Sequence, residues 1–326
     1  MHAGKVCLCI LELLLPAIAQ PPAGWVENIQ QGLSLQSQGR FTAAESRFES
    51  ALQEAERISD QPDLLAATLS YLAEAEIDLG RLDEATRLCQ RAISILVKSA
   101  GEADGRVQML RTELASLYLE SGQLATAEKL LREIISFQAR EGLTASPEAA
   151  FTLDALACLY VRQRKLAAAE AVERRSLSVL GALPEPDLAS VAVGNLHLSI
   201  FLNARKKPKE ALVYAERART MFQALPLPKP VMEAAADMSL ASIHAGLGRP
   251  ADAEAESRRA LETVENIYRP NDPQTAWLLL ARAAVLRRLD RKKEARVIQK
   301  QGESILWESG GNQLGETVPV EALLPH

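Results

Sequence analysis

The chain has 326 residues, of which 48% are hydrophobic, 24% are charged and only 4% are aromatic. This composition supports a folded core and excludes wholesale disorder. The net charge of −5 disfavours non-specific nucleic-acid binding, which needs a basic face to neutralise phosphates.

The N-terminal segment has the features of a secretory signal peptide. Lys5 supplies a short positive region, Val6 to Leu15 is mostly apolar, and Ala17-Ile18-Ala19 resembles a cleavage site. We therefore expect residues 1–19 to be a cleaved signal peptide and the protein to be exported, to the periplasm or outside the cell. The alternative is an uncleaved amphipathic helix on a cytoplasmic protein. The apolar run is too short to span a bilayer, so we expect no transmembrane segment in the mature chain.

An alanine recurs through the body of the chain at a period of 42 residues, after a first interval of 41. The column is Ala44, Ala85, Ala127, Ala169, Ala211, Ala253 and Ala295. Twelve residues before each alanine lies a small residue: Gly32, Ala73, Ala115, Ala157, Ser199, Ala241 and Ala283. Small residues at fixed intervals permit close approach where two helices cross, so the period predicts repeated helical hairpins.

A second column, five residues before each alanine, marks the turn of the hairpin. It holds Gly39, Gly80, Gly122, Arg164, Lys206, Gly248 and Asp290. Glycine adopts a positive φ at little cost, which a tight helix-to-helix turn requires. Pro208 and Pro250 follow the turn at the first helical position, where proline fits. Clusters of Pro, Gly and Asp separate the copies, and no segment alternates with period two, so we expect no strands.

Two segments carry a family resemblance. The run from Leu153 to Tyr160 followed by Lys165 to Glu170, and the run from Leu69 to Ala73 followed by Gly80 to Ala85, resemble the tetratricopeptide repeat pattern. The usual repeat has 34 residues, and a period of 42 resembles the subclass of the kinesin light chains. The resemblance implies an all-α, right-handed superhelical solenoid of about seven antiparallel helix-turn-helix hairpins over residues 25–307. Residues 308–326 would then form a largely irregular C-terminal tail.

The resemblance also implies a binding face. In this family the first helix of each hairpin lines the concave face. Positions i, i+4 and i+7 of such a helix lie on one side of it, and each of these positions, followed from repeat to repeat, forms one row. The predicted partner-binding residues are Ser70, Glu74, Ile77, Thr112, Ser116, Leu119, Asp154, Cys158, Val161, Leu196, Ile200, Asn203, Met238 and Ser242. For the third row, which includes Val161, two interpretations stay open: contact with a peptide, or packing between adjacent first helices.

We therefore expect a non-enzymatic scaffold that binds a protein or an extended peptide, with no nucleic acid as partner and no cofactor or metal. The alternative is a cytosolic regulatory or sensor subunit. Only Asn203 matches the Asn and Arg rows of the kinesin-type groove, and the carboxylate clamp of chaperone adaptors is absent. An acidic cargo motif is therefore not expected.

The search for chemistry finds no catalytic motif. His197 and His244 lie in different repeats without metal-ligand spacing, and Cys89 and Cys158 are expected to be unpaired residues in or near the core. The last copy is rich in Lys and Arg, which indicates either a solvated polar cap or a site for an anionic partner. We expect Trp277 and Trp307 to cover the ends of the core. The apolar tail segment from Thr317 to Leu324 either docks in the groove or is disordered.

Overall fold

The computed structural model describes residues 21–58, 60–226, 229–266 and 273–308. All regular secondary structure in these ranges is helical, with no strand, as the sequence predicts. The predicted signal peptide, residues 1–19, and the predicted tail after Glu308 lie outside the described residues. The chain divides into two compact units, one through Thr144 and the other from Ala145.

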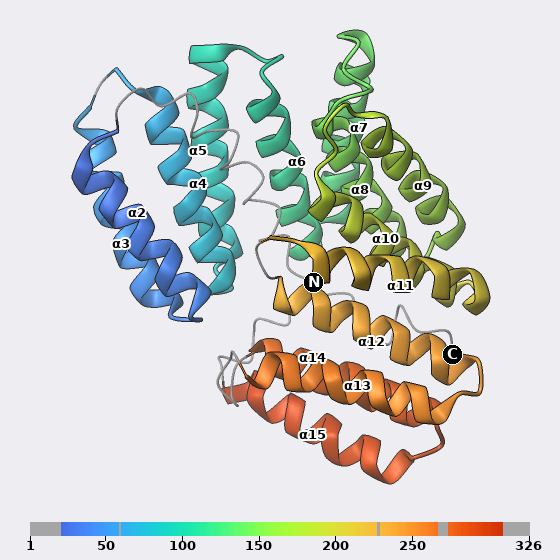
Figure 1. The fold of residues 1–326 in the computed structure, drawn as a ribbon. Coiled ribbons are helices and arrows are strands. Elements are labelled where there is room, and N and C mark those ends of the chain that lie inside the picture. The colour runs from blue at the N-terminus through green and yellow to red at the C-terminus, as the bar shows by residue number, and fades with distance from the viewer. Residues whose placement is uncertain (1–20, 59, 227–228, 267–272, 309–326) are drawn as a thin grey trace. The chain divides into compact units, whose positions relative to one another are not determined.

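Unit 1 consists of three helical hairpins (Figure 1). Each helix packs against the next one in sequence. The helices are α2 (Ala23–Ser37), α3 (Phe41–Glu56), α4 (Pro62–Asp78), α5 (Leu82–Ala100), α6 (Gly105–Glu120) and α7 (Leu124–Arg140).

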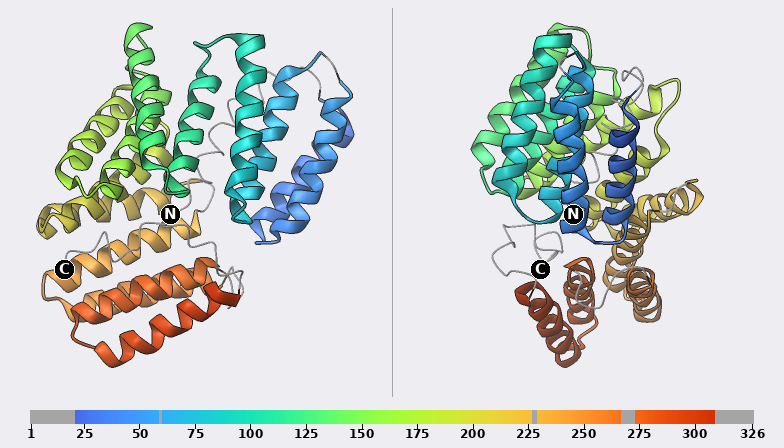
Figure 2. Two further views of the ribbon diagram at one scale, coloured as in Figure 1. Left: turned by 180° about the vertical axis from the view of Figure 1, so that it is seen from behind. Right: turned by 90° about the vertical axis from the view of Figure 1, so that its left-hand side faces the viewer.

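Unit 2 consists of four further hairpins. Its helices are α8 (Pro147–Arg162), α9 (Leu166–Ala182), α10 (Leu188–Ala204), α11 (Pro208–Ala224), α12 (Pro230–Gly246), α13 (Pro250–Glu265), α14 (Pro273–Arg288) and α15 (Lys292–Glu308). The left view of Figure 2 shows the last hairpins, gold to red, stacked as successive layers. The predicted all-α repeat solenoid is therefore confirmed, with seven hairpins in the described part of the chain.

The alanine column forms the tightest helix contacts of the fold. All seven alanines have no exposed surface: Ala44, Ala85, Ala127, Ala169, Ala211, Ala253 and Ala295. The small residue twelve positions earlier is buried in every copy as well. In the first copy this residue is Gly32, and a Cβ placed there would lie 2.3 Å from the ring of Phe48. Small side chains are thus required because the two helices of each hairpin leave no room for larger ones.

The turn column adopts the left-handed conformation in all seven copies. Glycine occupies it in four of them, and Arg164, Lys206 and Asp290 occupy it with φ of 59°, 61° and 58°. The backbone N–H of the next residue then donates to the carbonyl five residues earlier, as from Lys207 to Leu202 O at 2.9 Å. This bond closes the end of the first helix. The geometry of the repeat therefore imposes a positive φ even where the residue disfavours it.

The helix starts follow the expected chemistry. Pro208 and Pro250 are the first residues of α11 and α13, as predicted, and α4, α8, α12 and α14 also begin with proline. Three starts, that of α8 among them, are capped by side chains: Asp104, Ser146 and Asp187 each accept a backbone N–H from the first turn of the helix that follows. These features end one repeat and begin the next without a long loop.

Unit 1 also buries a carboxyl group. Glu113 of α6 is 3% exposed, and neither of its carboxylate oxygens accepts a hydrogen bond from a residue that the structure describes. Burial, with a smaller contribution from the charge of Glu120, raises the pKa of Glu113 to about 8. The folded protein therefore favours the neutral acid at this position near neutral pH.

Replacing Lys206 by glycine should stabilise the protein. A left-handed φ costs an L-residue about 1–2 kcal/mol, and the greater freedom of glycine in the unfolded chain offsets part of that gain. We expect Lys206→Gly to raise the free energy of unfolding by about 0.5–1 kcal/mol, measured from the midpoint of urea denaturation followed by circular dichroism. The matched control is Gly80→Lys, which should lower it by about the same amount. A neutral or destabilising Lys206→Gly would show that the turn is not strained.

Glu113 should make stability fall as pH rises. The unfolded carboxyl titrates near about 4.3, so between that pH and about 8 the folded state keeps a proton that the unfolded state has released. The free energy of unfolding should therefore decrease through this window by up to about 1.4 kcal/mol per pH unit. Glu113→Gln keeps a neutral side chain and should remove that decrease, measured by urea denaturation across the window.

The matched control for Glu113→Gln is Glu133→Gln, which changes an exposed glutamate on α7 of the same unit. This variant should keep the slope of the unchanged protein. If Glu113→Gln also keeps it, the carboxyl group is not held neutral in the folded state.

Candidate functional site

The residues predicted to bind a partner lie on the first helices of successive hairpins. In unit 1, α4 and α6 carry six of them, and all six are buried: Ser70, Glu74, Ile77, Thr112, Ser116 and Leu119. The hydroxyls of Ser70, Thr112 and Ser116 donate to carbonyls four residues earlier in their own helices, at 3.0–3.2 Å. Such bonds satisfy a hydroxyl inside a helix.

In unit 2, five of the eight predicted residues are buried. These are Val161 on α8, Leu196 and Asn203 on α10, and Met238 and Ser242 on α12. Asp154, Cys158 and Ile200 are partly exposed. The assignment of all fourteen residues to partner binding stays a prediction, and the structure directs attention to the partly exposed three.

A buried apolar cluster decides between the two interpretations of Val161. Val161 is 7% exposed and packs in one cluster with Ala157 and with Phe201 of the following first helix. Ile200 and Tyr160 border the same cluster and are half-buried. At this position the structure favours packing between adjacent first helices, and Ile200 is one of the partly exposed apolar residues beside the cluster.

Polar contacts connect three successive first helices of unit 2. Asn203 Nδ2 on α10 donates to Ser242 Oγ on α12 at 3.0 Å. Arg288 Nη1 on α14 donates to the carbonyl oxygen of Ser242 at 2.9 Å and to its Oγ at 2.8 Å. Burial lowers the pKa of the Arg288 guanidinium. We call Asn203, Ser242 and Arg288 the polar ladder.

The polar ladder passes beside a glycine. A Cβ built on Gly246 of α12 would lie 3.9 Å from Asn203 Oδ1 and 4.0 Å from Arg288 Nη1. Gly246 therefore adds no side chain between the amide of Asn203 and the guanidinium of Arg288. A Cβ at these distances would make ordinary van der Waals contact with both groups.

A second polar group of unit 2 was missed by sequence reasoning. His197 Nδ1 on α10 lies 2.6 Å from Asp154 Oδ1 on α8, and both lie near Cys158. His197 also stacks on Phe201, with ring centroids 6.0 Å apart. The signal was present, because Asp154 and Cys158 are one helical turn apart and His197 follows about one repeat later.

Several basic residues of the last copy are engaged in ion pairs. Arg282 and Arg291 both contact the carboxylate of Glu254, at 2.8 and 2.6 Å. Lys292 pairs with Asp290 at 3.0 Å. These pairs favour the interpretation as a polar cap, and Arg288 in addition reaches α12.

The other histidine and the two cysteines singled out in the sequence show no sign of an activated nucleophile. His244 is 8% exposed, which agrees with a packed ring, and Cys89 and Cys158 are both free thiols. Burial raises the pKa of both thiols, so neither is an activated nucleophile. The expectation for Trp307 is wrong, since 79% of its surface is exposed at the end of α15.

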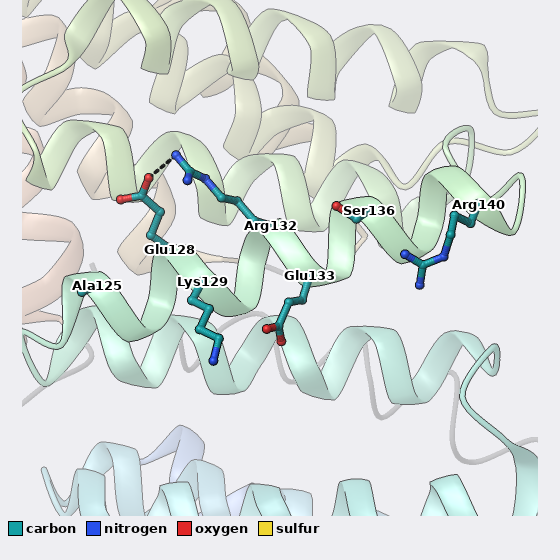
Figure 3. A pocket seen from close by; sticks show the side chains of 7 residues that line it. All are labelled: Ala125, Glu128, Lys129, Arg132, Glu133, Ser136 and Arg140. Carbon is teal, nitrogen blue, oxygen red and sulfur yellow. Dashed lines mark ion pairs between the residues drawn. The ribbon is translucent and has the colours of Figure 1, made fainter.

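A shallow surface hollow on α7 lies away from the predicted rows (Figure 3). Its walls are charged side chains of mixed sign, and Arg132 pairs with Glu128 at 2.5 Å. Long, solvated side chains of both signs hold no fixed geometry for a small ligand. We do not assign a site there.

No helix among those described is long and apolar enough to cross a membrane.

Comparisons with known proteins agree with the fold. Two family models, both of the tetratricopeptide repeat, match residues 65–104 and 232–306. A search of the curated proteins finds no significant match.

Solved structures similar to this chain include three of note. BtubC (BKLC) from P. vanneervenii is 23% identical, with a TM-score of 0.55 over 69% of this chain and 90% of that one. The Rap conjugation gene regulator of plasmid pLS20, in complex with the Phr* peptide, is 13% identical, with a TM-score of 0.71 over 89% and 76%. NprR in complex with its cognate peptide NprX is 11% identical, with a TM-score of 0.60 over 92% and 83%.

At these identities the solved structures establish the fold and nothing finer. Together with the two family matches and the 42-residue columns, they identify the architecture that the sequence resembles. Tetratricopeptide repeats thus match residues 65–104 and 232–306, and the helices of the other described residues form hairpins of the same kind.

Proposed function

We propose that this protein is a non-enzymatic scaffold that binds a protein or an extended peptide along the first helices of unit 2. The observation that carries the proposal is the polar ladder, in which Asn203, Ser242 and Arg288 connect three successive first helices. Two of the similar solved structures hold peptides, which supports the same class of ligand.

The chemistry of the polar ladder suits an extended chain. Asn203 is 5% exposed and its Nδ2 donates to Ser242, so the amide oxygen is the group that would accept a hydrogen bond from a peptide backbone N–H, whatever the side chains are. Arg288 adds a cation that recognises a carboxylate. Ile200, half-buried on α10 at the edge of an apolar cluster, offers a contact for an apolar side chain. The ligand we propose is therefore a peptide with apolar residues and one carboxylate.

We also propose that the protein is exported, on the basis of the N-terminal sequence pattern, which includes Lys5 and Ala17-Ile18-Ala19. The alternative is a cytosolic regulatory or sensor subunit, and one of the similar structures is that of a conjugation gene regulator. Sequencing the N-terminus of the mature protein separates the two. A chain that begins at Gln20 supports export, and an intact Met1 contradicts it.

The binding face can be tested with peptides selected from a random linear library on the full chain. Fluorescence anisotropy then gives the dissociation constant for each variant. Asn203→Ala removes a backbone-binding amide and should weaken binding about 5- to 20-fold, which corresponds to about 1–2 kcal/mol. Ile200→Arg places a charge at the apolar contact and should weaken it more strongly.

The matched control is Val213→Arg, which changes a residue of α11 that is 54% exposed and lies on a second helix. Circular dichroism checks that each variant keeps its helices. Binding that is unchanged in both Asn203→Ala and Ile200→Arg, or that is lost in Val213→Arg, would place the ligand on another face.

A further inference from the structure

Three potential metal ligands converge in unit 2 from two neighbouring first helices. Asp154 and Cys158 are four residues apart on α8, and His197 lies on α10. One ligand atom from each lies within 4.8 Å of the others. Ligands at about 2.0–2.3 Å from a tetrahedral ion lie about 3.3–3.8 Å from one another, so side-chain shifts of about 1 Å would complete the geometry.

A fourth group faces the same place from α9. Glu173 has no exposed surface, and neither carboxylate oxygen accepts a hydrogen bond from a donor group that the structure describes. Its carboxyl lies beside that of Asp154, to which it can donate a hydrogen bond when it is protonated. Its Oε1 lies 3.0 Å from the position that a Cβ on Gly194 of α10 would occupy. Gly194 therefore makes room for this carboxyl group between α9 and α10. A buried, unsatisfied acid is costly unless something compensates it.

The electrostatics of the cluster favour a cation. Burial, followed by the charge of Asp154, raises the pKa of Glu173 well above its usual range. Burial, followed by the charges of Asp154 and Glu173, does the same for the Cys158 thiol. The charge of Asp154 thus opposes the ionisation of both Glu173 and Cys158. A divalent cation would reverse that effect by stabilising the carboxylates and the thiolate together.

We propose that unit 2 binds one Zn²⁺ ion between α8, α9 and α10, with four protein ligands: Asp154, Cys158, Glu173 and His197. The donors are one sulfur, one imidazole nitrogen and two carboxylate oxygens. A thiolate with an imidazole selects zinc over magnesium or calcium, which prefer oxygen ligands alone. On binding, the Cys158 thiol releases its proton to solvent, as does the Glu173 carboxyl where it is protonated. The proposal does not depend on peptide binding.

An alternative use of the same residues is a Cys-His-Asp nucleophile. That chemistry needs a thiolate in the free protein, because the thiol itself is a weak nucleophile. The raised pKa of Cys158 leaves the thiol protonated in the absence of a metal. The geometry therefore supports coordination rather than covalent catalysis.

Cobalt can report the site directly, because a thiolate ligand gives Co²⁺ a charge-transfer absorption. The test uses the tag-free full chain with Cys7→Ser and Cys9→Ser, so that thiols of the N-terminal segment cannot bind metal, after removal of metal with a chelator. We expect one Co²⁺ per chain with a tetrahedral thiolate spectrum, displaced by one equivalent of Zn²⁺. The absence of this spectrum would overturn the proposal.

Variants then assign the ligands. Cys158→Ser should abolish the charge-transfer absorption, and His197→Gln and Glu173→Gln should each weaken Zn²⁺ binding at least about 10-fold, measured by competition with a chromophoric chelator. The matched control is Cys89→Ser, which changes the buried thiol of unit 1 and should leave binding unchanged. Binding that survives in Cys158→Ser, or that is lost in Cys89→Ser, would overturn the assignment.

A measurement without ligand substitutions guards against variants that fail to fold. In the Cys7→Ser, Cys9→Ser chain, Zn²⁺ should slow alkylation of Cys158 by more than about 10-fold, quantified by mass spectrometry of the Cys158 peptide. Mg²⁺ at the same concentration should have no effect. Equal alkylation of Cys158 with and without Zn²⁺ would contradict the proposal.

Discussion

The fold depends on the close crossing of the two helices in each hairpin, which the alanine column permits. All seven alanines have no exposed surface, and a Cβ at Gly32 would overlap the ring of Phe48. Because every hairpin closes in the same way, each repeat presents the same positions to the next one. Contacts between first helices therefore recur about one period apart: Trp25 donates to Thr68, Gln36 to Asp78, and Asn203 to Ser242.

The second helices show a similar regularity with a shorter offset. Arg81 pairs with Glu45, Arg219 with Glu256, and Arg291 with Glu254, at separations of 36 or 37 residues. These pairs lie mostly at the surface, where each contributes little stability alone. Glu170 and Glu256 are more deeply buried, at 7% and 9% exposed. Glu170 contacts Lys207, Arg174 and Arg205, which together hold its pKa below its usual range. Polar contacts between neighbouring hairpins thus recur at regular sequence separations, as the apolar contacts do.

The sequence predicts the backbone of this protein well because the residues that recur with the repeat are those that the backbone geometry demands. The small residues mark the crossings, and the turn column marks a positive φ even at Arg164, Lys206 and Asp290, which no composition rule singles out. Side-chain exposure is less predictable. Periodicity assigns Ser70, Thr112 and Leu196 to one face of their helices, but how tightly adjacent first helices pack decides whether that face is accessible. In the structure these three are buried, while Ile200 and Asp154 are partly exposed.

Polar side chains that reach across repeats could not be predicted from composition. Arg288 belongs to a basic run that suggests a solvated cap, yet it turns to Ser242, because a long side chain can span the distance between two first helices. Trp307 was expected to cover the core but is exposed. Its helix, α15, is the last of the described array, and no further described helix packs against it there. Only three-dimensional packing distinguishes these cases.

Asp154 and Cys158 belong both to the predicted binding rows and to the proposed zinc ligands, and this overlap has a physical consequence. A metal bound by α8, α9 and α10 would fix the relative positions of two adjacent hairpins. Ile200 and Asn203 lie on α10, within two turns of His197. A site for an extended peptide gains affinity when its contacts are already in place, because less conformational freedom is lost on binding. Zinc in unit 2 would therefore strengthen peptide binding without touching the peptide, by holding α10 in register with α8.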